Sequence, residues 1–112
     1  RKHLHQQIGE AMERIYHDSL PRQYDLLVSH FRESGDTERL VKYLVLAADR
    51  NRTEFNNEVA INYYREVLEL VPRDPRVPEI RYRYAQVAYQ TGKYEEAKEQ
   101  LGKLLADTGS AA

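Results

Sequence analysis

The sequence contains no cysteine and no tryptophan, and only one methionine, among its 112 residues. Without cysteine the chain can form neither a disulfide framework nor a thiolate metal site. No apolar run approaches the roughly 20 residues that a membrane-spanning helix needs. The polar stretch 1–10 also lacks the apolar core of a secretory signal peptide. We therefore expect a cytoplasmic protein with no membrane partner.

An excess of charge of either sign is also lacking. The 17 basic and 18 acidic residues give a formal net charge of −1, and both signs are spread along the whole chain. A surface that binds nucleic acid needs local cations to neutralise phosphates. The only cationic cluster consists of Arg73, Arg76, Arg81 and Arg83. Because Asp74 and Glu79 partly neutralise it, we expect no nucleic-acid partner and keep a nucleic-acid-binding regulator arm as a third alternative.

Small and apolar residues recur at fixed intervals around two of the five glycines. One set, separated by 7, 5, 4 and 3 residues, is Ala85, Gly92, Ala97, Leu101 and Leu104. The same steps occur 57 residues earlier, at Val28, Gly35, Leu40, Leu44 and Ala47. A glycine can adopt the left-handed conformation that ends a helix. Each set therefore predicts a helix, a tight turn and a second helix, which makes the chain a repeat protein.

Apolar residues at helical spacing predict six helices, at about 2–17, 22–34, 37–52, 57–71, 78–91 and 94–106. No stretch shows the alternation of a strand. Short connections force neighbouring helices to run antiparallel, and each pair leaves an apolar face that the next pair can cover. The predicted fold is all-α, with antiparallel helix–turn–helix pairs stacked as a short α-solenoid.

The clearest break in the chain lies at three prolines spaced three residues apart, Pro72, Pro75 and Pro78. We expect one helical domain over residues 1–112. It would consist of irregular repeats at 1–71, a proline-rich break at 72–78, a regular repeat at 79–106 and a frayed tail at 107–112. Because the chain starts without methionine and in helical composition, we expect it to be a fragment of a larger protein.

Residues 78–106 resemble the tetratricopeptide repeat (TPR) at Tyr84, Ala85, Tyr89, Gly92, Tyr94, Ala97, Leu101 and Leu104. The second half of another such repeat occurs earlier, at Ala60, Tyr64, Val67, Leu68 and Pro72. The two best copies lie 57 residues apart, whereas a regular TPR is about 34 residues long, so the array is irregular. The resemblance implies a non-catalytic scaffold for protein–protein interaction.

Residues 1–72 resemble one particular helical segment, which follows the ATPase region in bacterial signalling ATPases. Such ATPases are fused to class III adenylate or guanylate cyclases or to LuxR-type regulators. The matching positions are Arg1, Leu4, His5, His30, Phe31, Gly35, Asp36, Asn57, Ala60, Tyr63 and Tyr64. The resemblance implies a role in signal transduction. No P-loop motif occurs, so ATPase or cyclase activity would lie elsewhere in the larger protein.

The residues that could carry chemistry do not form a recognisable constellation. His3 and His5 would point to different faces of one helix, and no acidic residue lies four positions beyond any histidine. We expect His30 to pack between helices. The serines lack the sequence context of a nucleophile, and the paired glutamates are typical of solvated helix faces. We therefore expect no catalytic residue, no metal and no cofactor.

Nine tyrosines against two phenylalanines are the unusual part of the composition. Helical spacing puts Tyr84 on the apolar face of the fifth helix, so we expect it to be buried. The other side presents a stripe of Tyr82, Arg83, Gln86, Tyr89 and Gln90. Tyrosine and arginine are enriched at binding hot spots. The TPR resemblance implies that such a stripe lines a groove for a partner.

The matching places on the second helix are occupied by Asp25, Ser29, Arg32 and Glu33, and we add the first three to the candidate groove. We predict a groove for a protein or peptide, which includes other domains of the same chain. An ordinary amphipathic surface is the alternative interpretation. A structural spacer or oligomerisation element is the second functional hypothesis, because the outer face of the sixth helix would be apolar and would favour a homodimer.

Overall fold

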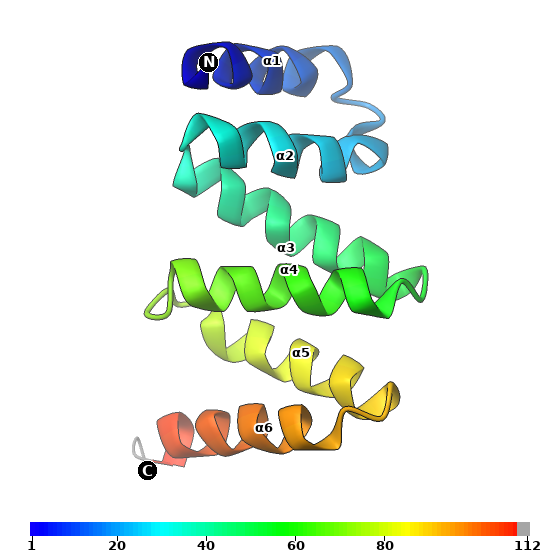
Figure 1. Cartoon of the computed structure of the whole chain (residues 1–112), viewed down its shortest axis with the longest axis vertical. Coiled ribbons are helices and arrows are strands. Elements are labelled where there is room, and N and C mark those ends of the chain that lie inside the picture. The colour runs from blue at the N-terminus through cyan, green and yellow to red at the C-terminus, as the bar shows by residue number, and fades with distance from the viewer. Residues whose placement is uncertain (110–112) are drawn as a thin grey trace.

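The computed structural model describes residues 1–109 as six α-helices and one 3₁₀-helix (Figure 1). They are α1 (Lys2–Ile15), η1 (Leu20–Gln23), α2 (Tyr24–Ser34), α3 (Thr37–Thr53), α4 (Asn57–Leu70), α5 (Val77–Gln90) and α6 (Tyr94–Gly109). The predicted all-α fold is confirmed. Of the tail expected to fray, residues 107–109 continue α6, and residues 110–112 lie outside the described residues.

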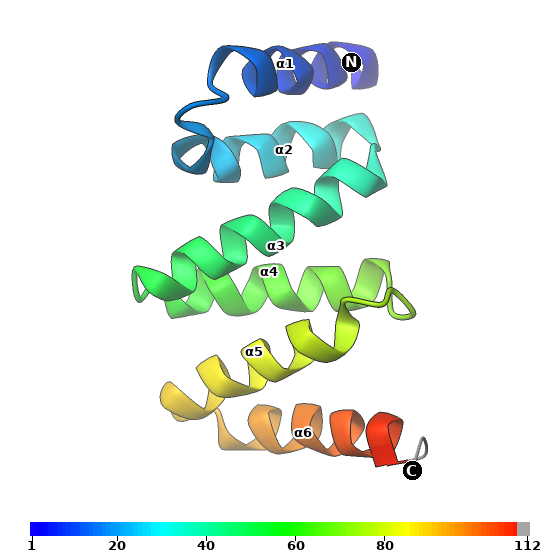
Figure 2. The same cartoon turned by 180° about the vertical axis from the view of Figure 1, so that it is seen from behind.

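The helices follow one another along the long axis of the molecule, and each runs antiparallel to the next (Figures 1 and 2). The extents are 43 × 28 × 23 Å. Each α-helix from α2 to α5 packs against the α-helix before it and the α-helix after it, and α1 and α6 pack against their single neighbours. This succession of antiparallel pairs is consistent with a TPR-like stack.

Contacts between alternate helices define two layers. The first layer contains α1, α3 and α5. In it, the Tyr43 hydroxyl of α3 donates to Glu13 Oε2 of α1 at 2.5 Å. Arg83 Nη1 of α5 donates to Asp49 Oδ2 of α3 at 2.8 Å. Each pair of residues joins two helices that are not consecutive in the chain.

The second layer contains α2, α4 and α6. Arg32 of α2 donates to both carboxylate oxygens of Glu66 on α4, at 2.9 and 2.6 Å. Arg65 of α4 in turn forms an ion pair with Glu96 of α6. Odd-numbered and even-numbered helices therefore lie on opposite sides of the stack.

The two repeated glycines end helices in the expected way. Gly35 and Gly92 have φ angles of 82° and 83°, in the left-handed region that only glycine enters without a Cβ penalty. Asp36 then caps α3, because its carboxylate accepts from the Arg39 amide at 3.1 Å. The 57-residue repeat in the sequence therefore reflects two helices that end in the same way, at Gly35 and at Gly92.

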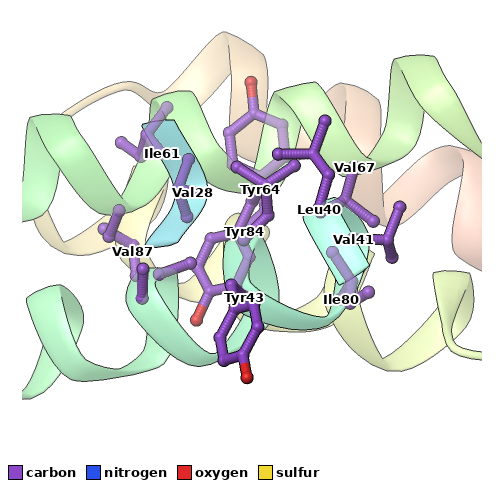
Figure 3. Close-up of a cluster of buried hydrophobic side chains, with 14 of the residues drawn as sticks. Val28, Leu40, Val41, Tyr43, Ile61, Tyr64, Val67, Ile80, Tyr84 and Val87 are labelled. Carbon is purple, nitrogen blue, oxygen red and sulfur yellow. The ribbon is translucent and has the colours of Figure 1, made fainter. Parts of the chain in front are cut away.

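The core is a continuous apolar cluster to which all six α-helices contribute. Figure 3 shows side chains of α2, α3, α4 and α5 meeting in it. Tyr43, Tyr64 and Tyr84 come from three successive helices and are all buried, as expected for Tyr84. Each hydroxyl has a hydrogen-bond partner, which for Tyr84 is Nε of Arg65 at 3.0 Å. Their rings can therefore fill the core without leaving a polar atom unpaired.

Two glycines in the middle of helices lie in opposite environments. Gly9 of α1 is buried against Phe31 of α2, and a Cβ atom at Gly9 would lie 2.6 Å from Cζ of that ring. Gly102 of α6 has no atom within 4 Å of the corresponding position. Gly9 thus lets α1 and α2 approach closely, whereas Gly102 only weakens its helix.

We expect Gly9→Ala to lower the free energy of unfolding by about 1–3 kcal/mol, because the added methyl group must displace the buried Phe31 ring. Gly102→Ala should raise that free energy by about 0.5–1 kcal/mol, since alanine favours helix over glycine and meets nothing. Urea unfolding followed by circular dichroism measures both. Stabilisation by both substitutions would contradict the close packing of α1 on α2.

Candidate interaction surface

The predicted stripe on α5 does face outward. Tyr82 is 45% exposed, and Gln86, Tyr89 and Gln90 are exposed with it. Gln86 Nε2 donates to the Tyr82 hydroxyl at 3.3 Å, which links two of these side chains one helical turn apart. The Tyr89 ring packs on Tyr94 of α6, with centroids 5.4 Å apart. The stripe thus offers an aromatic and amide surface on the outside of the first layer.

Arg83 differs from the rest of the stripe because it is partly buried and paired. Its Nη1 donates to Asp49 Oδ2 at 2.8 Å, and its Nε donates to Glu79 Oε2 at 3.2 Å. Asp49 Oδ1 also accepts from the Tyr64 hydroxyl at 2.5 Å. Burial and this hydrogen bond raise the pKa of Tyr64. Arg83 therefore holds α5 to α3, whose Asp49 also binds α4, in addition to bordering the surface.

The three residues predicted on α2 lie in the other layer. Asp25 Oδ1 accepts from the Tyr63 hydroxyl of α4 at 2.8 Å, and burial together with this bond raises the pKa of Tyr63 to about 12. Arg32 is paired with Glu66, also on α4. Ser29 is exposed on the same helix. The structure does not bring Asp25, Ser29 and Arg32 together with the α5 stripe.

The number of helices between α2 and α5 explains why these residues lie in the other layer. An offset of 57 residues relates α2 to α5, which are three helices apart. Since consecutive helices alternate between the layers, an odd number of steps moves an equivalent position to the opposite layer. Gly35 and Gly92 do end helices in equivalent turns. The 57-residue repeat nevertheless relates two surfaces on opposite sides of the stack.

The neighbour of the α5 stripe within its own layer is α3. Lys42 is exposed there, one helical turn from Glu38 and two turns from Asp49. A depression of about 530 Å³ lies between the starts of α3 and α5 and is lined by Asp36, Glu38, Arg39, Lys42 and Arg76. Sequence reasoning missed this part of the surface. A comparison of helices two apart, rather than three, would have pointed to it.

We call the outer face of these two helices the α3–α5 surface and define it by Lys42, Asp49, Tyr82, Arg83 and Gln86. Its centre is the Arg83–Asp49 ion pair, with Tyr82 and Gln86 on one side and Lys42 on the other. The paired charges fix the two helices relative to each other. The exposed tyrosine, glutamine and lysine remain available to a partner.

The four arginines of the cationic cluster do not form one patch. Arg76 pairs with Asp74 and holds the pKa of that carboxyl well below its usual value. Arg81 Nη1 donates to Gln100 Oε1 at 2.6 Å, on the side of α5 that faces α6. Arg83 is occupied by Asp49. Arg76 and Arg83 are therefore each paired with a carboxylate, and Arg81 is directed toward α6 instead.

His3 and His17 are exposed, whereas His5 and His30 contact each other. His30 lies between α1 and α2, and its Nδ1 is 3.0 Å from Nδ1 of His5. Within residues 1–109, no three histidine, aspartate or glutamate side chains are grouped so that they could hold a metal ion. None of the helices in that range is both long and apolar enough to cross a membrane.

The tetratricopeptide repeat family matches residues 52–112, which is more than half of the chain. The chain therefore belongs to the tetratricopeptide repeat family. The match includes α4, α5 and α6, and thus the two helices on which the sequence resemblance was strongest. No curated protein and no solved structure matches the chain. Repeats of this family generally bind protein partners.

We expect Asp49→Ala to lower the free energy of unfolding by about 1–3 kcal/mol, because it leaves the Tyr64 hydroxyl and the Arg83 guanidinium without their shared acceptor. Glu79→Ala removes the exposed partner of the same arginine and should change stability by less than about 0.5 kcal/mol. Thermal unfolding of the two variants beside the wild type is the measurement. Equal losses would mean that Asp49 does not join the helices.

Proposed function

We propose that this chain is a non-catalytic scaffold that binds a protein or peptide partner on the α3–α5 surface. The observation that carries the proposal is the exposure of Tyr82 and Gln86 beside an ion pair that already holds its two helices in place. A partner would meet a surface that needs little reorganisation, which lowers the entropy cost of binding. The family match supports the proposal, since TPR repeats generally bind proteins.

The chemistry of the surface suits a partner with both apolar and polar groups. The Tyr82 ring can cover an apolar side chain, while its hydroxyl and the Gln86 amide can hydrogen-bond to a peptide backbone. Lys42 adds a cation, and its Nζ lies 5.2 Å from the centroid of the Tyr43 ring. Tyrosines in such positions often carry much of the binding energy. We place Tyr82 at the centre of the contact.

The resemblance of residues 1–72 to a segment of bacterial signalling ATPases supports a cytoplasmic signalling context for this scaffold. In that context the partner would be another domain of the same protein or a separate signalling protein. The proposal covers both kinds of signalling ATPase that the resemblance includes, those fused to a class III cyclase and those fused to a LuxR-type regulator. The 112 residues would then supply a contact surface, and any nucleotide chemistry would take place in other domains.

A structural spacer is the second candidate. The elongated stack, whose longest extent is 43 Å, favours it, because such a stack can hold two other parts of a protein at a fixed separation. The candidates differ in what the α3–α5 surface does. A spacer would tolerate changes at Tyr82, whereas a scaffold would lose its partner.

The test starts from peptides selected on the immobilised wild-type chain from a random-peptide display library. Tyr82→Ala should weaken the binding of the selected peptides at least about tenfold, as expected for a hot-spot tyrosine. Tyr16→Ala is the matched control, because Tyr16 is a tyrosine of similar exposure (40%) at the end of α1. Fluorescence anisotropy gives both dissociation constants. Equal affinity for both variants, or no selected peptide, would remove the α3–α5 surface as the binding site.

A further inference from the structure

An open depression of about 550 Å³ is lined by residues of α4, α5 and α6. It shares no residue with the α3–α5 surface. Its charged residues are three cations and three carboxylates, namely Arg65, Arg81, Lys103, Glu69, Glu96 and Glu99. Leu68 and Pro72 add an apolar part to the wall. The depression is therefore polar and electrically balanced, in contrast to the aromatic stripe on the outer side of α5.

Arg81 lines this depression without a counter-ion. Its Nη1 donates to Gln100 Oε1 at 2.6 Å, and Gln100 is only 6% exposed. Its Nε is buried and has no hydrogen-bond partner. No carboxylate within residues 1–109 forms an ion pair with this guanidinium. A buried amide thus anchors Arg81 at one nitrogen, and the opposite edge of the guanidinium is left to bind something else.

Two other arginines of the chain show what this edge binds. Arg32 donates through Nε and Nη2 to the two carboxylate oxygens of Glu66. Arg76 donates through the same two nitrogens to Asp74. In Arg81 the Nε–Nη2 edge has no partner among the described residues. Because this edge matches a carboxylate with two parallel hydrogen bonds, Arg81 favours a ligand that carries a carboxylate.

Glu96 supplies an unused acceptor close to Arg81. Its Oε1 pairs with Arg65, whereas its Oε2 is buried and has no hydrogen-bond partner. Glu96 lies one helical turn before Gln100, to which Arg81 is bonded, so the two charged groups are neighbours in the wall. Buried polar atoms without a partner are costly. A ligand that satisfies both atoms must offer an acceptor to Arg81 and a donor to Glu96.

We propose that this depression binds a free α-amino acid with an aliphatic side chain. The carboxylate of the ligand accepts from the Nε–Nη2 edge of Arg81, and its ammonium group donates to Glu96 Oε2. The aliphatic side chain covers Leu68 and Pro72. The balance of charges in the wall favours a zwitterion, because a singly charged ligand would meet as many like charges as opposite ones. The volume is in the range of small-molecule sites.

The test compares L-leucine with two derivatives that each lack one charge. N-acetyl-L-leucine has no ammonium group, and L-leucinamide has no carboxylate. Titration of the isotope-labelled chain into the millimolar range, followed by two-dimensional NMR, gives the three dissociation constants. L-leucine should bind at least about tenfold more tightly than either derivative, because each derivative loses a charge-assisted hydrogen bond. The resonances that shift should belong to α4, α5 and α6.

Two substitutions assign each charge of the ligand to its partner. Arg81→Gln should weaken L-leucine binding at least about tenfold and abolish the preference over L-leucinamide. Glu96→Gln should instead abolish the preference over N-acetyl-L-leucine. Arg14→Gln is the control, since it removes an exposed arginine of α1 and should leave all three constants unchanged. If Arg81→Gln does not fold, Arg81→Lys replaces it, because lysine keeps the charge and lacks the two-nitrogen edge.

Three results would overturn the proposal. The first is a wild-type chain that binds none of the three compounds or binds all three equally well. The second is a loss of binding in Arg14→Gln as large as in Arg81→Gln. The third is a preference for L-leucine over L-leucinamide that survives Arg81→Gln, because the carboxylate would then bind elsewhere. None of these results bears on the α3–α5 surface, so the proposed function stands or falls separately.

Discussion

The stack depends on one shared acceptor, the carboxylate of Asp49. Its two oxygens accept from the Tyr64 hydroxyl of α4 and from the Arg83 guanidinium of α5, so that a single side chain of α3 holds two further helices. The Tyr64 ring is buried, and its hydroxyl would be costly to leave unpaired. Asp49 therefore gives the Tyr64 hydroxyl a hydrogen-bond acceptor, and it also fixes the position of Arg83 at the surface. The geometry of the α3–α5 surface follows from this requirement.

Alternation between two layers is the constraint that decides which residues can act together. Within its layer, a helix shares an outer face with the helix two steps away. Ion pairs between alternate helices fix this arrangement in both layers, as Arg83 with Asp49 shows in the first and Arg32 with Glu66 shows in the second. Consequently a partner that binds Tyr82 on α5 can reach α3 and cannot at the same time reach Ser29 on α2.

The six helices and their glycine-ended turns were predictable from the sequence because periodicity and the conformational freedom of Gly35 and Gly92 are local properties. The burial of Tyr84 followed from the same periodicity. The pairing of Arg83 with Asp49 was not predictable, because the two residues are 34 positions apart in the sequence. Local patterns also do not tell which layer of the stack each helix joins. The φ angle of 64° at Phe55, in the turn between α3 and α4, was not predictable, because left-handed turns are predicted from glycine or asparagine.

The α3–α5 surface makes one demand on the fold. It needs α3 and α5 to keep their relative position, which the buried Tyr64 hydroxyl and Asp49 provide.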